Sequence, residues 1–421
     1  MEVRLFDFQQ KALEETKGMN RVAYYYDMGL GKTFIGSEKA VSFGKQILVV
    51  CQKSKIKDWV EHFENYYSHH PHWLVVSSLT NEGCRKSFLE GHIKVGIINY
   101  DSVWRRTELA KLKNFTLLLD ESSMIQNETS KRSKFILWKL KPDNVILLSG
   151  TPVGGKYENL WSQLRLLGWN ISKTEYWNRF INYYIDDRQG FPLKVVYGYK
   201  NVDCLKEKMH DLGCLFKKSS EVLTLPQQTF IPIKVPSSVQ YRKFRKNRIV
   251  EIDDRELVGD TTLTKLLYER QLCGMYSKDK LKALEDLLLS TEDRVVIFYS
   301  FTDELHEIEH ICNGLNKPVS VINGEKKDLD NYRLKGDSVT IVQYQAGAMG
   351  LNLQMANRII YFTPPLSSEL FEQSKKRIHR IGQKHTCFYY KLICELSVEE
   401  RIYDTLDMRK DFTDRLFEKE G

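Results

Sequence analysis

A glycine-rich turn that ends in lysine and threonine has the clearest capacity for chemistry in this chain. Residues 22–26 (VAYYY) have the apolar and aromatic character of a buried strand, and Gly31-Lys32-Thr33 then opens a helical pattern. Glycines let backbone N–H groups approach a phosphate, a helix N-terminus favours an anion, and lysine and threonine can contact the terminal phosphates and Mg²⁺. The stretch predicts a nucleotide site; a glycine turn that merely caps a helix is the alternative.

Two carboxylates follow a second buried strand. Residues 115–119 (FTLLL) lead directly into Asp120 and Glu121. Burying a charge is costly unless it is paired or bound to a metal. Asp120 is therefore predicted to hold the Mg²⁺ of the nucleotide together with Thr33, and Glu121 to orient and polarise the attacking water. By itself, the segment also fits a strand that ends in a solvated acidic turn.

Polar residues elsewhere in the first part of the chain extend this hypothesis. Gln9 lies upstream of the turn, and its amide can donate and accept, as reading an adenine edge requires. Ser54 and Lys55 follow the apolar run 47–51 and can hold a phosphodiester backbone or form a solvated basic loop.

The order of apolar runs predicts an α/β fold. Strand and helix patterns alternate from residue 22 to 168, which favours a parallel sheet with its ligands at the carboxyl ends of the strands. A second run of this kind begins near residue 291 and lacks the glycine turn. We expect a first lobe over 1–168, a helical protrusion and linker over 169–290, a second lobe over 291–396 and a C-terminal helix over 397–421. Residues 176–184 are predicted to be helical, and Pro226, Pro232 and Pro236 to mark a linker.

Composition excludes several classes of protein. The 421 residues are 42% hydrophobic and 28% charged, which fits a globular protein of two to three domains. No apolar run reaches the roughly 18 residues that span a bilayer. The eight cysteines form no CxxC pair, so we expect a reduced, cytoplasmic location. The formal net charge of +8 is compatible with a polyanionic partner.

Four short motifs occur in an order that is typical of one family: GLGKT at 29–33, DE at 120–121, SGTP at 149–152 and HRIGQ at 379–383. The set resembles the Swi/Snf-type DNA translocases of helicase superfamily two over nearly the whole chain. This resemblance implies two tandem RecA-like P-loop lobes with a helical region between them. It also implies that hydrolysis of ATP with Mg²⁺ drives tracking along the minor groove of duplex DNA, usually without full strand separation.

The resemblance assigns roles by position. Lys32, Glu121, Arg377 and Arg380 are similar to the catalytic set, with the two arginines on one helical face as arginine fingers, worth about 10³–10⁵ in rate. Further nucleotide contacts would come from Gln9, Met28, Gly29, Leu30, Gly31, Thr33 and Gly350. Contacts to the tracked strand, or couplings between the lobes, would come from Ser54, Lys55, Asn99, Thr151, Gly347, Asn352 and Gln373.

The chain departs from the family pattern at several positions. Tyr26 stands where a P-loop usually has its first glycine. Ser122-Ser123 follow the two acids, where the family usually has a small residue and a histidine that relays the nucleotide state. Gln52 and Gly155 replace a common proline and asparagine, and residues 345–352 are a looser glycine-rich segment. Such features resemble the compact bacterial, phage and annealing-helicase-like branch.

The leading hypothesis is a duplex-DNA-stimulated ATPase that remodels protein–DNA complexes or branched DNA. We expect it to be a monomer associated with the nucleoid, with a DNA-bound protein as a further target. A strand-separating DNA or RNA helicase is the alternative. His306 and His310 match the HExxH zinc-peptidase pattern, although an amphipathic helix gives the same spacing. An inactive nucleic-acid-binding scaffold is the fourth reading. The basic segment 242–248 is interpreted as a solvated face rather than a phosphate-contacting helix.

Overall fold

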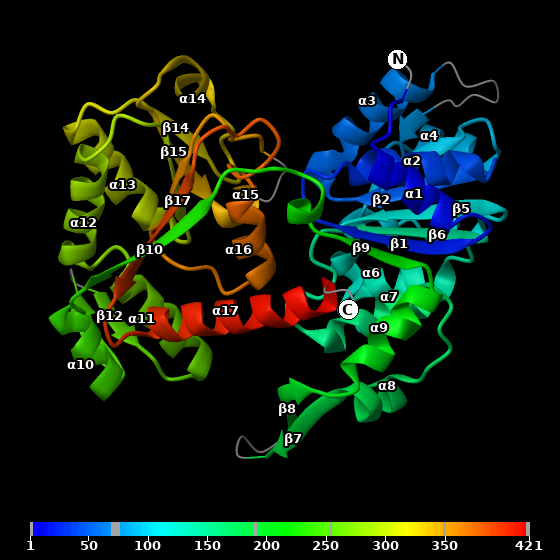
Figure 1. The fold of residues 1–421 in the computed structure, drawn as a ribbon. Coiled ribbons are helices and arrows are strands. Elements are labelled where there is room, and N and C mark those ends of the chain that lie inside the picture. The colour runs from blue at the N-terminus through cyan, green and yellow to red at the C-terminus, as the bar shows by residue number, and fades with distance from the viewer. Residues whose placement is uncertain (1–2, 69–75, 188–191, 253–254, 348–350, 418–421) are drawn as a thin grey trace. The chain divides into compact units, whose positions relative to one another are not determined.

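The computed structural model describes residues 3–68, 76–187, 192–252, 255–347 and 351–417 (Figure 1). The chain divides into two compact units, Met1–Val222 with Asp411–Gly421, and Leu223–Lys410. Among the described residues, no helix combines the length and the apolar character needed to cross a bilayer.

The first unit is built on a seven-stranded sheet with helices on both faces. Its strand order is β3-β4-β2-β5-β6-β1-β9, and every neighbouring pair is parallel. The strands are β1 (Arg21–Tyr26), β2 (Gln46–Cys51), β3 (Val76–Ser78), β4 (Val95–Asn99), β5 (Phe115–Asp120), β6 (Asn144–Ser149) and β9 (Cys214–Lys217). Its helices are α1 (Asp7–Glu15), α2 (Lys32–Ser42), α3 (Ile56–Tyr67), α4 (Glu82–Leu89), α5 (Tyr100–Val103), α6 (Lys131–Lys134), α7 (Trp161–Leu166), α8 (Lys173–Phe180) and α9 (Val202–Asp211).

The order of this sheet explains why distant motifs meet. The central strands β5, β6 and β1 are neighbours, and their interiors are continuous apolar runs, as a parallel strand buried on both faces requires. The register pairs Tyr25 with Ser149 and Asp120 with Leu148. The turn after β1, the acids after β5 and the SGTP loop after β6 therefore lie at one edge of the sheet.

The second unit has a six-stranded parallel sheet in the order β10-β17-β16-β13-β15-β14. The strands are β10 (Gln228–Val235), β13 (Val295–Tyr299), β14 (Val319–Ile322), β15 (Val339–Gln343), β16 (Arg358–Tyr361) and β17 (Cys387–Cys394). Its helices are α10 (Val239–Asn247), α11 (Thr262–Cys273), α12 (Lys278–Leu289), α13 (Thr302–Gly314), α14 (Asp330–Leu334), α15 (Tyr344–Gly347) and α16 (Ser368–Lys375), and α17 (Val398–Phe417) begins in this unit. The two tandem parallel sheets with flanking helices confirm the predicted fold class.

Two antiparallel hairpins were not expected from the sequence. β7 (Ile181–Asp186) pairs with β8 (Leu193–Tyr199) in the first unit, and β11 (Ile249–Ile252) pairs with β12 (Arg255–Val258) in the second. The predicted helix over 176–184 is therefore wrong beyond Phe180, where α8 ends. The β-branched and aromatic residues that follow fit a strand better than a helix.

The proline-marked segment also differs from a simple linker. Pro232 lies within β10 and pairs with Lys391 of β17. Proline has no N–H to donate, and it is tolerated here because β10 is an edge strand with one neighbour. The region 169–290 thus adds an edge strand to each sheet, β9 to the first and β10 to the second.

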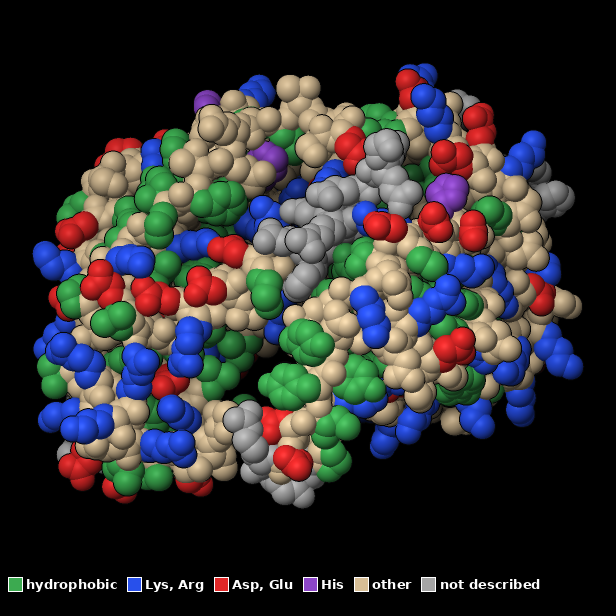
Figure 2. Space-filling view, turned by 60° about the horizontal axis from the view of Figure 1, so that its bottom comes forward, with side chains coloured by type: hydrophobic (Ala, Val, Ile, Leu, Met, Phe, Trp, Pro, Cys, Tyr) green, Lys and Arg blue, Asp and Glu red, His purple; other side chains and the backbone are tan. Residues whose placement is uncertain are grey.

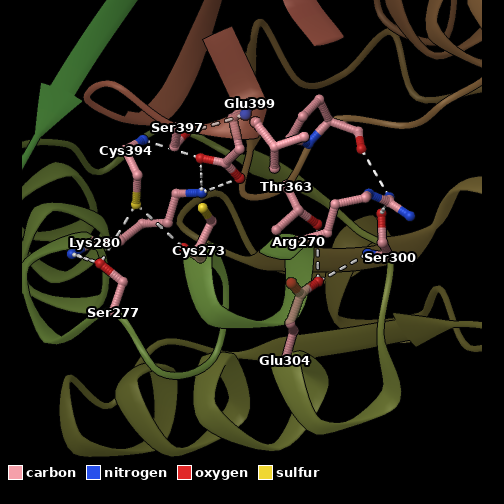
Figure 3. A network of polar contacts seen from close by, with 12 residues as sticks. Arg270, Cys273, Ser277, Lys280, Ser300, Glu304, Thr363, Cys394, Ser397 and Glu399 are labelled. Atoms are coloured by element: carbon pink, nitrogen blue, oxygen red, sulfur yellow. Dashed lines mark hydrogen bonds and ion pairs between the residues drawn. The ribbon is translucent and has the colours of Figure 1, made fainter. Parts of the chain in front are cut away.

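A buried polar network ties α12 to the first turn of α17 (Figure 3). Lys280 Nζ donates to both carboxylate oxygens of Glu399, at 2.6 and 2.7 Å, and neither side chain is exposed. The backbone N–H of Cys394 also donates to Glu399. Because the charges are paired and hydrogen-bonded, their burial is compatible with a stable fold.

A second buried acid lies in the same network. Glu304 Oε2 accepts hydrogen bonds from the backbone N–H groups of Ser300 and Phe301, at 2.9 and 3.1 Å, and from Thr363 Oγ1 at 2.9 Å. Arg270 donates to Ser300 Oγ and to the carbonyl oxygen of Pro364. Burial raises the pKa of Glu304 to about 7.

The predicted basic segment forms α10, whose inner face buries Tyr241 and Phe244. Arg242, Lys243 and Lys246 are exposed on its outer side. Lys and Arg side chains gather on the lower left of Figure 2, the side of the second unit where Figure 1 places α10.

Candidate nucleotide and nucleic-acid site

The glycine turn between β1 and α2 has the geometry that requires glycine. Gly29 and Gly31 have φ of 85° and 66°, in the left-handed region that side chains with a Cβ rarely adopt. A Cβ atom at Gly31 would lie 2.6 Å from Gln9 Nε2. Gly31 is also the N-cap of α2, so the turn delivers the free N–H groups of a helix N-terminus.

Lys32 folds back across this turn. Its Nζ donates to the carbonyl oxygens of Tyr26 and Asp27, at 2.9 and 3.3 Å. A Cβ at Gly150 would lie 3.4 Å from the same Nζ, so the ammonium lies beside the SGTP loop. Two neutral carbonyl groups are weaker partners for an ammonium than a phosphate, which would form charge-assisted hydrogen bonds.

Gln9 holds the turn through hydrogen bonds to its backbone. Its Nε2 donates to the carbonyl oxygens of Leu30 and Gly31, its Oε1 accepts from the N–H of Phe6, and the residue is 1% exposed. Both ends of the amide are therefore engaged within the protein. Reading of an adenine edge by Gln9 stays a prediction, and it would require these hydrogen bonds to be exchanged.

The acid pair lies at a strained end of β5. Glu121 has φ of 54° and ψ of 62°, a left-handed conformation that costs a non-glycine residue on the order of 1–3 kcal/mol. Tyr100 OH donates to the carbonyl oxygens of Asp120 and Glu121, at 2.9 and 3.3 Å, and holds this conformation. Strain of this kind concentrates at functional sites.

Asp120 is a half-buried carboxylate whose hydrogen-bond donor is neutral. Its Oδ2 accepts a hydrogen bond of 2.8 Å from Trp59 Nε1. Burial raises the pKa of Asp120, while Trp59 and the charge of Lys32 act in the opposite direction. A divalent cation at this carboxylate would favour its ionised form.

The SGTP loop is joined to the acid pair by two routes. Ser149 Oγ donates to Glu121 Oε2 at 3.5 Å, a long contact. The shorter route passes through Gln163 on α7, whose Oε1 accepts from Ser122 Oγ at 2.7 Å and whose Nε2 donates to the carbonyl oxygen of Pro152 at 2.8 Å. Ser122, rather than Ser123, makes this link.

The remaining predicted contacts of the first unit follow the same edge of the sheet. Ser54 is exposed in η1 (Lys53–Lys55) after β2, and Lys55 Nζ forms a 2.6 Å ion pair with Asp58. Asn99 ends β4 and is buried. Thr151 is buried, and its Oγ1 has no hydrogen-bond partner. A buried hydroxyl without a partner is expected to find one in a ligand, a water or a rearranged loop.

The predicted residues of the second unit are partly structural. A Cβ at Gly347 would lie 2.8 Å from Val342 Cγ1 and 2.9 Å from Phe298 Cε1, so packing explains this glycine. Gly350 lies outside the described residues. Gln373 is buried on α16, donates to Glu369 Oε1 at 3.3 Å and has an Oε1 without a partner.

The two arginines do not share a helical face, contrary to the prediction. α16 ends at Lys375, before Arg377 and Arg380. The N–H of Leu353 donates to the carbonyl oxygen of Arg377, and Arg380 Nη1 donates to Leu351 O and Asn352 Oδ1. Tertiary contacts with residues 351–353 therefore replace the helical turn that the spacing suggested. Partial burial lowers the pKa of Arg380.

Gln383 in the HRIGQ motif holds its own loop together. Its Nε2 donates to the carbonyl oxygens of Gln354, Ala356 and Ile378, and its Oε1 accepts from the N–H groups of Lys384 and His385. His379 Nε2 contacts the carbonyl oxygen of Pro226 at 2.9 Å. The motif thus contains residues that hold the loop as well as a candidate catalytic arginine.

Sequence reasoning missed Trp59, Tyr100 and Gln163, which hold the acid pair and the SGTP loop. Trp59 and Tyr100 follow β2 and β4, at the carboxyl edge of the sheet where ligands bind. This position could have indicated from the sequence that they belong to the site. Gln163 lies on α7, and no sequence pattern indicated its role.

The HExxH pair shows no metal-site geometry. His306 and His310 are exposed on α13, whose inner face carries Leu305 and Ile308. Within the described ranges, the one group of acids, cysteines and histidines close enough to hold a metal is Cys273, Cys394 and Glu399. There the ammonium of Lys280 already contacts both oxygens of Glu399, in the place of a cation.

Two protein families match this chain. The SNF2-related domain matches residues 19–277, and the helicase conserved C-terminal domain matches residues 279–382. The chain is 25% identical over 435 residues to the SWI/SNF-related matrix-associated actin-dependent regulator of chromatin subfamily A member 1 of Mus musculus, covering 91% of this chain and 40% of that protein. It is 24% identical over 348 residues to a putative ATP-dependent helicase/translocase of Bacillus subtilis, covering 75% of this chain and 37% of that protein.

A solved structure also matches. The Sulfolobus solfataricus SWI2/SNF2 ATPase core in complex with dsDNA aligns with a TM-score of 0.48 and 21% identity, over 98% of this chain and 92% of that chain. The chain spans about two fifths of the length of the two named relatives.

Proposed function

Because the chain belongs to the SNF2-related family of DNA-dependent ATPases in the helicase superfamily, we propose that it is an ATP-driven translocase on double-stranded DNA. It would remodel protein–DNA complexes or branched DNA without full strand separation. One observation carries the proposal: the glycine turn, the acid pair and the SGTP loop, which are far apart in sequence, meet at one edge of the first sheet.

The first unit supplies what ATP and Mg²⁺ need. The N–H groups at the start of α2 would face the phosphates, and Lys32 would exchange the carbonyl oxygens of Tyr26 and Asp27 for phosphate oxygens. Asp120 fits Mg²⁺ because it is a half-buried carboxylate at the end of β5 with a neutral indole N–H as its hydrogen-bond donor. Thr33 and Asp120 would hold the ion, which would neutralise charge on the phosphates.

Glu121 is the proposed group that orients the attacking water. Tyr100 holds the left-handed backbone of Glu121, so its side chain extends from a fixed position at the end of β5. Ser149 Oγ lies 3.5 Å from one of the Glu121 carboxylate oxygens, so the carboxylate is directed toward the SGTP loop. Hydrolysis could then alter the turn at Glu121, and Ser122 and Gln163 would pass that change to Pro152.

The second unit would supply Arg377 and Arg380 to stabilise negative charge on the transferring phosphoryl group. Arg380 is held by Asn352 and Leu351, so it must exchange these contacts when it engages a phosphate. Ser54, Lys55, Asn99, Thr151, Gly347, Asn352 and Gln373 remain proposed contacts to the tracked strand or couplers between the units. We also propose that the protein is a monomer and that it is located on DNA inside the cell.

The decisive experiment is phosphate release measured with blunt duplex, forked DNA, single-stranded DNA and RNA. We expect stimulation by blunt duplex without single-stranded tails. Glu121→Gln and Lys32→Ala should abolish turnover, with Glu14→Gln and Lys11→Ala on the exposed side of α1 as controls. Full activity in Glu121→Gln would disprove the assignment of the water-orienting group.

Phosphate release, together with a measurement of bound zinc, distinguishes the alternatives. Strict dependence on a loaded single strand or on RNA would favour a strand-separating helicase. Absence of any phosphate release, with DNA binding retained, would favour an inactive scaffold. Stoichiometric zinc that is lost in His310→Ala would revive the peptidase reading.

A further inference from the structure

A groove on the second unit lies between α11 and α17, which run beside one another (Figure 1). Its volume is about 410 Å³. None of its lining residues belongs to the candidate nucleotide or nucleic-acid site. They are Thr262, Lys265, Leu266 and Glu269 of α11, Leu366, and Val398, Arg401, Ile402, Thr405, Leu406 and Arg409 of α17.

The spacing of the lining residues gives the groove its shape. Those of α17 recur every three or four positions from 398 to 409, which is one stripe along about 16 Å of helix. Those of α11 form a matching stripe from 262 to 269, along about 10 Å. A long trough between two helices fits a third helix, which would lay an apolar stripe of the same spacing into it.

Apolar surface remains exposed along the trough. Val398, Ile402 and Leu406 form its floor and belong to the core of the unit. Leu366, which lines it, is 45% exposed.

The charges around the trough are unbalanced. Lys265, Arg401 and Arg409 line it, against one acid, Glu269. Lys265 and Arg401 approach Glu269 at 3.9 and 3.7 Å, and Glu269 Oε1 is buried without a hydrogen-bond partner. The neighbouring helix α10, which packs against α11, adds exposed Arg242, Lys243 and Lys246. An occupant with net negative charge would complement this surface.

We propose that the groove binds an acidic amphipathic helix of a partner protein. Leucine-like side chains of that helix would lie on the floor formed by Ile402 and Leu406 and against Leu366. Glu or Asp side chains would face Arg401 and Arg409, and a hydroxyl or amide donor would satisfy Glu269 Oε1. Binding there can be measured apart from ATP turnover.

The experiment uses an array of 16-residue synthetic peptides of high helix propensity and the full chain. Two properties vary independently: leucines at positions i, i+3/i+4 and i+7 or in scrambled order, and Glu or Lys at the flanking positions. We expect micromolar binding by fluorescence anisotropy for the leucine-patterned Glu peptides, and at least tenfold weaker binding for the scrambled or Lys peptides. Binding should weaken with salt, because exposed charges are screened.

Variants of the groove separate its two contributions. Arg401→Gln/Arg409→Gln should weaken the Glu peptides about tenfold, while exposed Arg333→Gln/Lys335→Gln on and beside α14 should leave them unchanged. Thr405→Trp fills the trough without changing charge and should abolish binding. Leu366→Asp tests the apolar contact at a lining position that is 45% exposed, where folding should tolerate the change.

Several results would overturn the proposal. They are equal binding of Glu and Lys peptides, no binding above background by any patterned peptide, or binding that Thr405→Trp leaves intact. A concentration-dependent dimer that Thr405→Trp dissociates would assign the groove to a second copy of this chain. Competition of a duplex oligonucleotide for the groove, lost in Arg401→Gln/Arg409→Gln, would assign it to nucleic acid instead. Duplex-stimulated ATPase activity of each variant shows whether the proposed motor function stands on its own.

Discussion

Carboxylates removed from solvent have different surroundings in the two units of this protein, where Asp120 is half-buried and Glu304 and Glu399 are buried. In the first unit, Asp120 ends a central strand and has a neutral indole N–H as its hydrogen-bond donor. In the second unit, Glu399 is paired with the ammonium of Lys280, and Glu304 accepts bonds from two backbone N–H groups and a hydroxyl. The same α/β architecture thus has a half-buried acid with a neutral partner at the end of a strand in one unit, and the buried acids Glu304 and Glu399 with partners from the protein in the other.

The difference separates structural acids from functional ones. A buried charge is stable when its partner is built in, and its removal then leaves the other charge unpaired. A buried acid without a cationic partner at hydrogen-bond distance is expected to bind a metal or shift its pKa. From its position at the carboxyl end of a strand and the absence, among the described residues, of an ammonium group at hydrogen-bond distance, we propose Asp120 as a metal ligand, and we propose Glu399 as a structural acid.

The largest predicted effect is on the ion pair of the second unit. Glu399→Gln should lower the free energy of unfolding by about 3–5 kcal/mol, because Lys280 stays buried without its counter-ion. The measurement is urea unfolding of the full chain. The double variant Lys280→Met/Glu399→Leu should recover most of this loss. If Glu399→Gln alone unfolds like the parent chain, the pair is not structural.

Asp120→Asn should have the opposite effect, with a large loss of ATPase activity and little or no loss of stability. Loss of a Mg²⁺ ligand removes several kcal/mol of transition-state stabilisation, so phosphate release should fall at least about 10²-fold. Thermal stability should be unchanged or higher, since an inadequately paired buried charge is removed. Asp203→Asn, at an exposed carboxylate of α9, is the control for activity. A large fall in melting temperature would show that Asp120 is structural as well.

Glu304 should make the stability of the second unit depend on pH. Its pKa is about 7 in the folded protein, above that of an unfolded glutamate. The folded state therefore binds more protons between these two values, and stability falls as pH rises from about 4.5 to above 7. Each pKa unit is worth about 1.4 kcal/mol. Glu304→Gln should flatten the difference in unfolding free energy measured between pH 5 and pH 8.

Ser122→Ala should have the smallest effect on stability. One neutral hydrogen bond to Gln163 is lost, which costs about 1 kcal/mol. If Ser122 and Gln163 connect the acid pair to the SGTP loop, stimulation of the ATPase by duplex should fall more than the basal rate. Ser123→Ala provides the adjacent comparison. Equal loss of basal and stimulated rates would assign Ser122 to structure alone.

Much of the framework could be predicted from the sequence because it rests on local patterns. Continuous apolar runs identified the central strands, and polar residues after β1, β5 and β6 predicted where ligands would bind. Those patterns depend on burial along a single strand, which sequence records directly.

The features that escaped prediction depend on partners distant in sequence. β10 contains Pro232 and has no continuous buried apolar run, and its pairing with β17 spans about 160 residues. The course of the chain after Lys375 is set by contacts with residues 351–353. The bonds from Tyr100 and Gln163 likewise form only when separate strands and helices assemble.

Pro232 has a further consequence for the behaviour of the whole chain. A parallel sheet that stops at an exposed edge offers its unused N–H and C=O groups to other chains, and such edges seed intermolecular aggregation. A residue that offers no N–H, placed within the outermost strand, interrupts that row of groups and hinders the docking of a foreign strand. The same proline that disguises β10 in the sequence should therefore help keep this protein dispersed at high concentration.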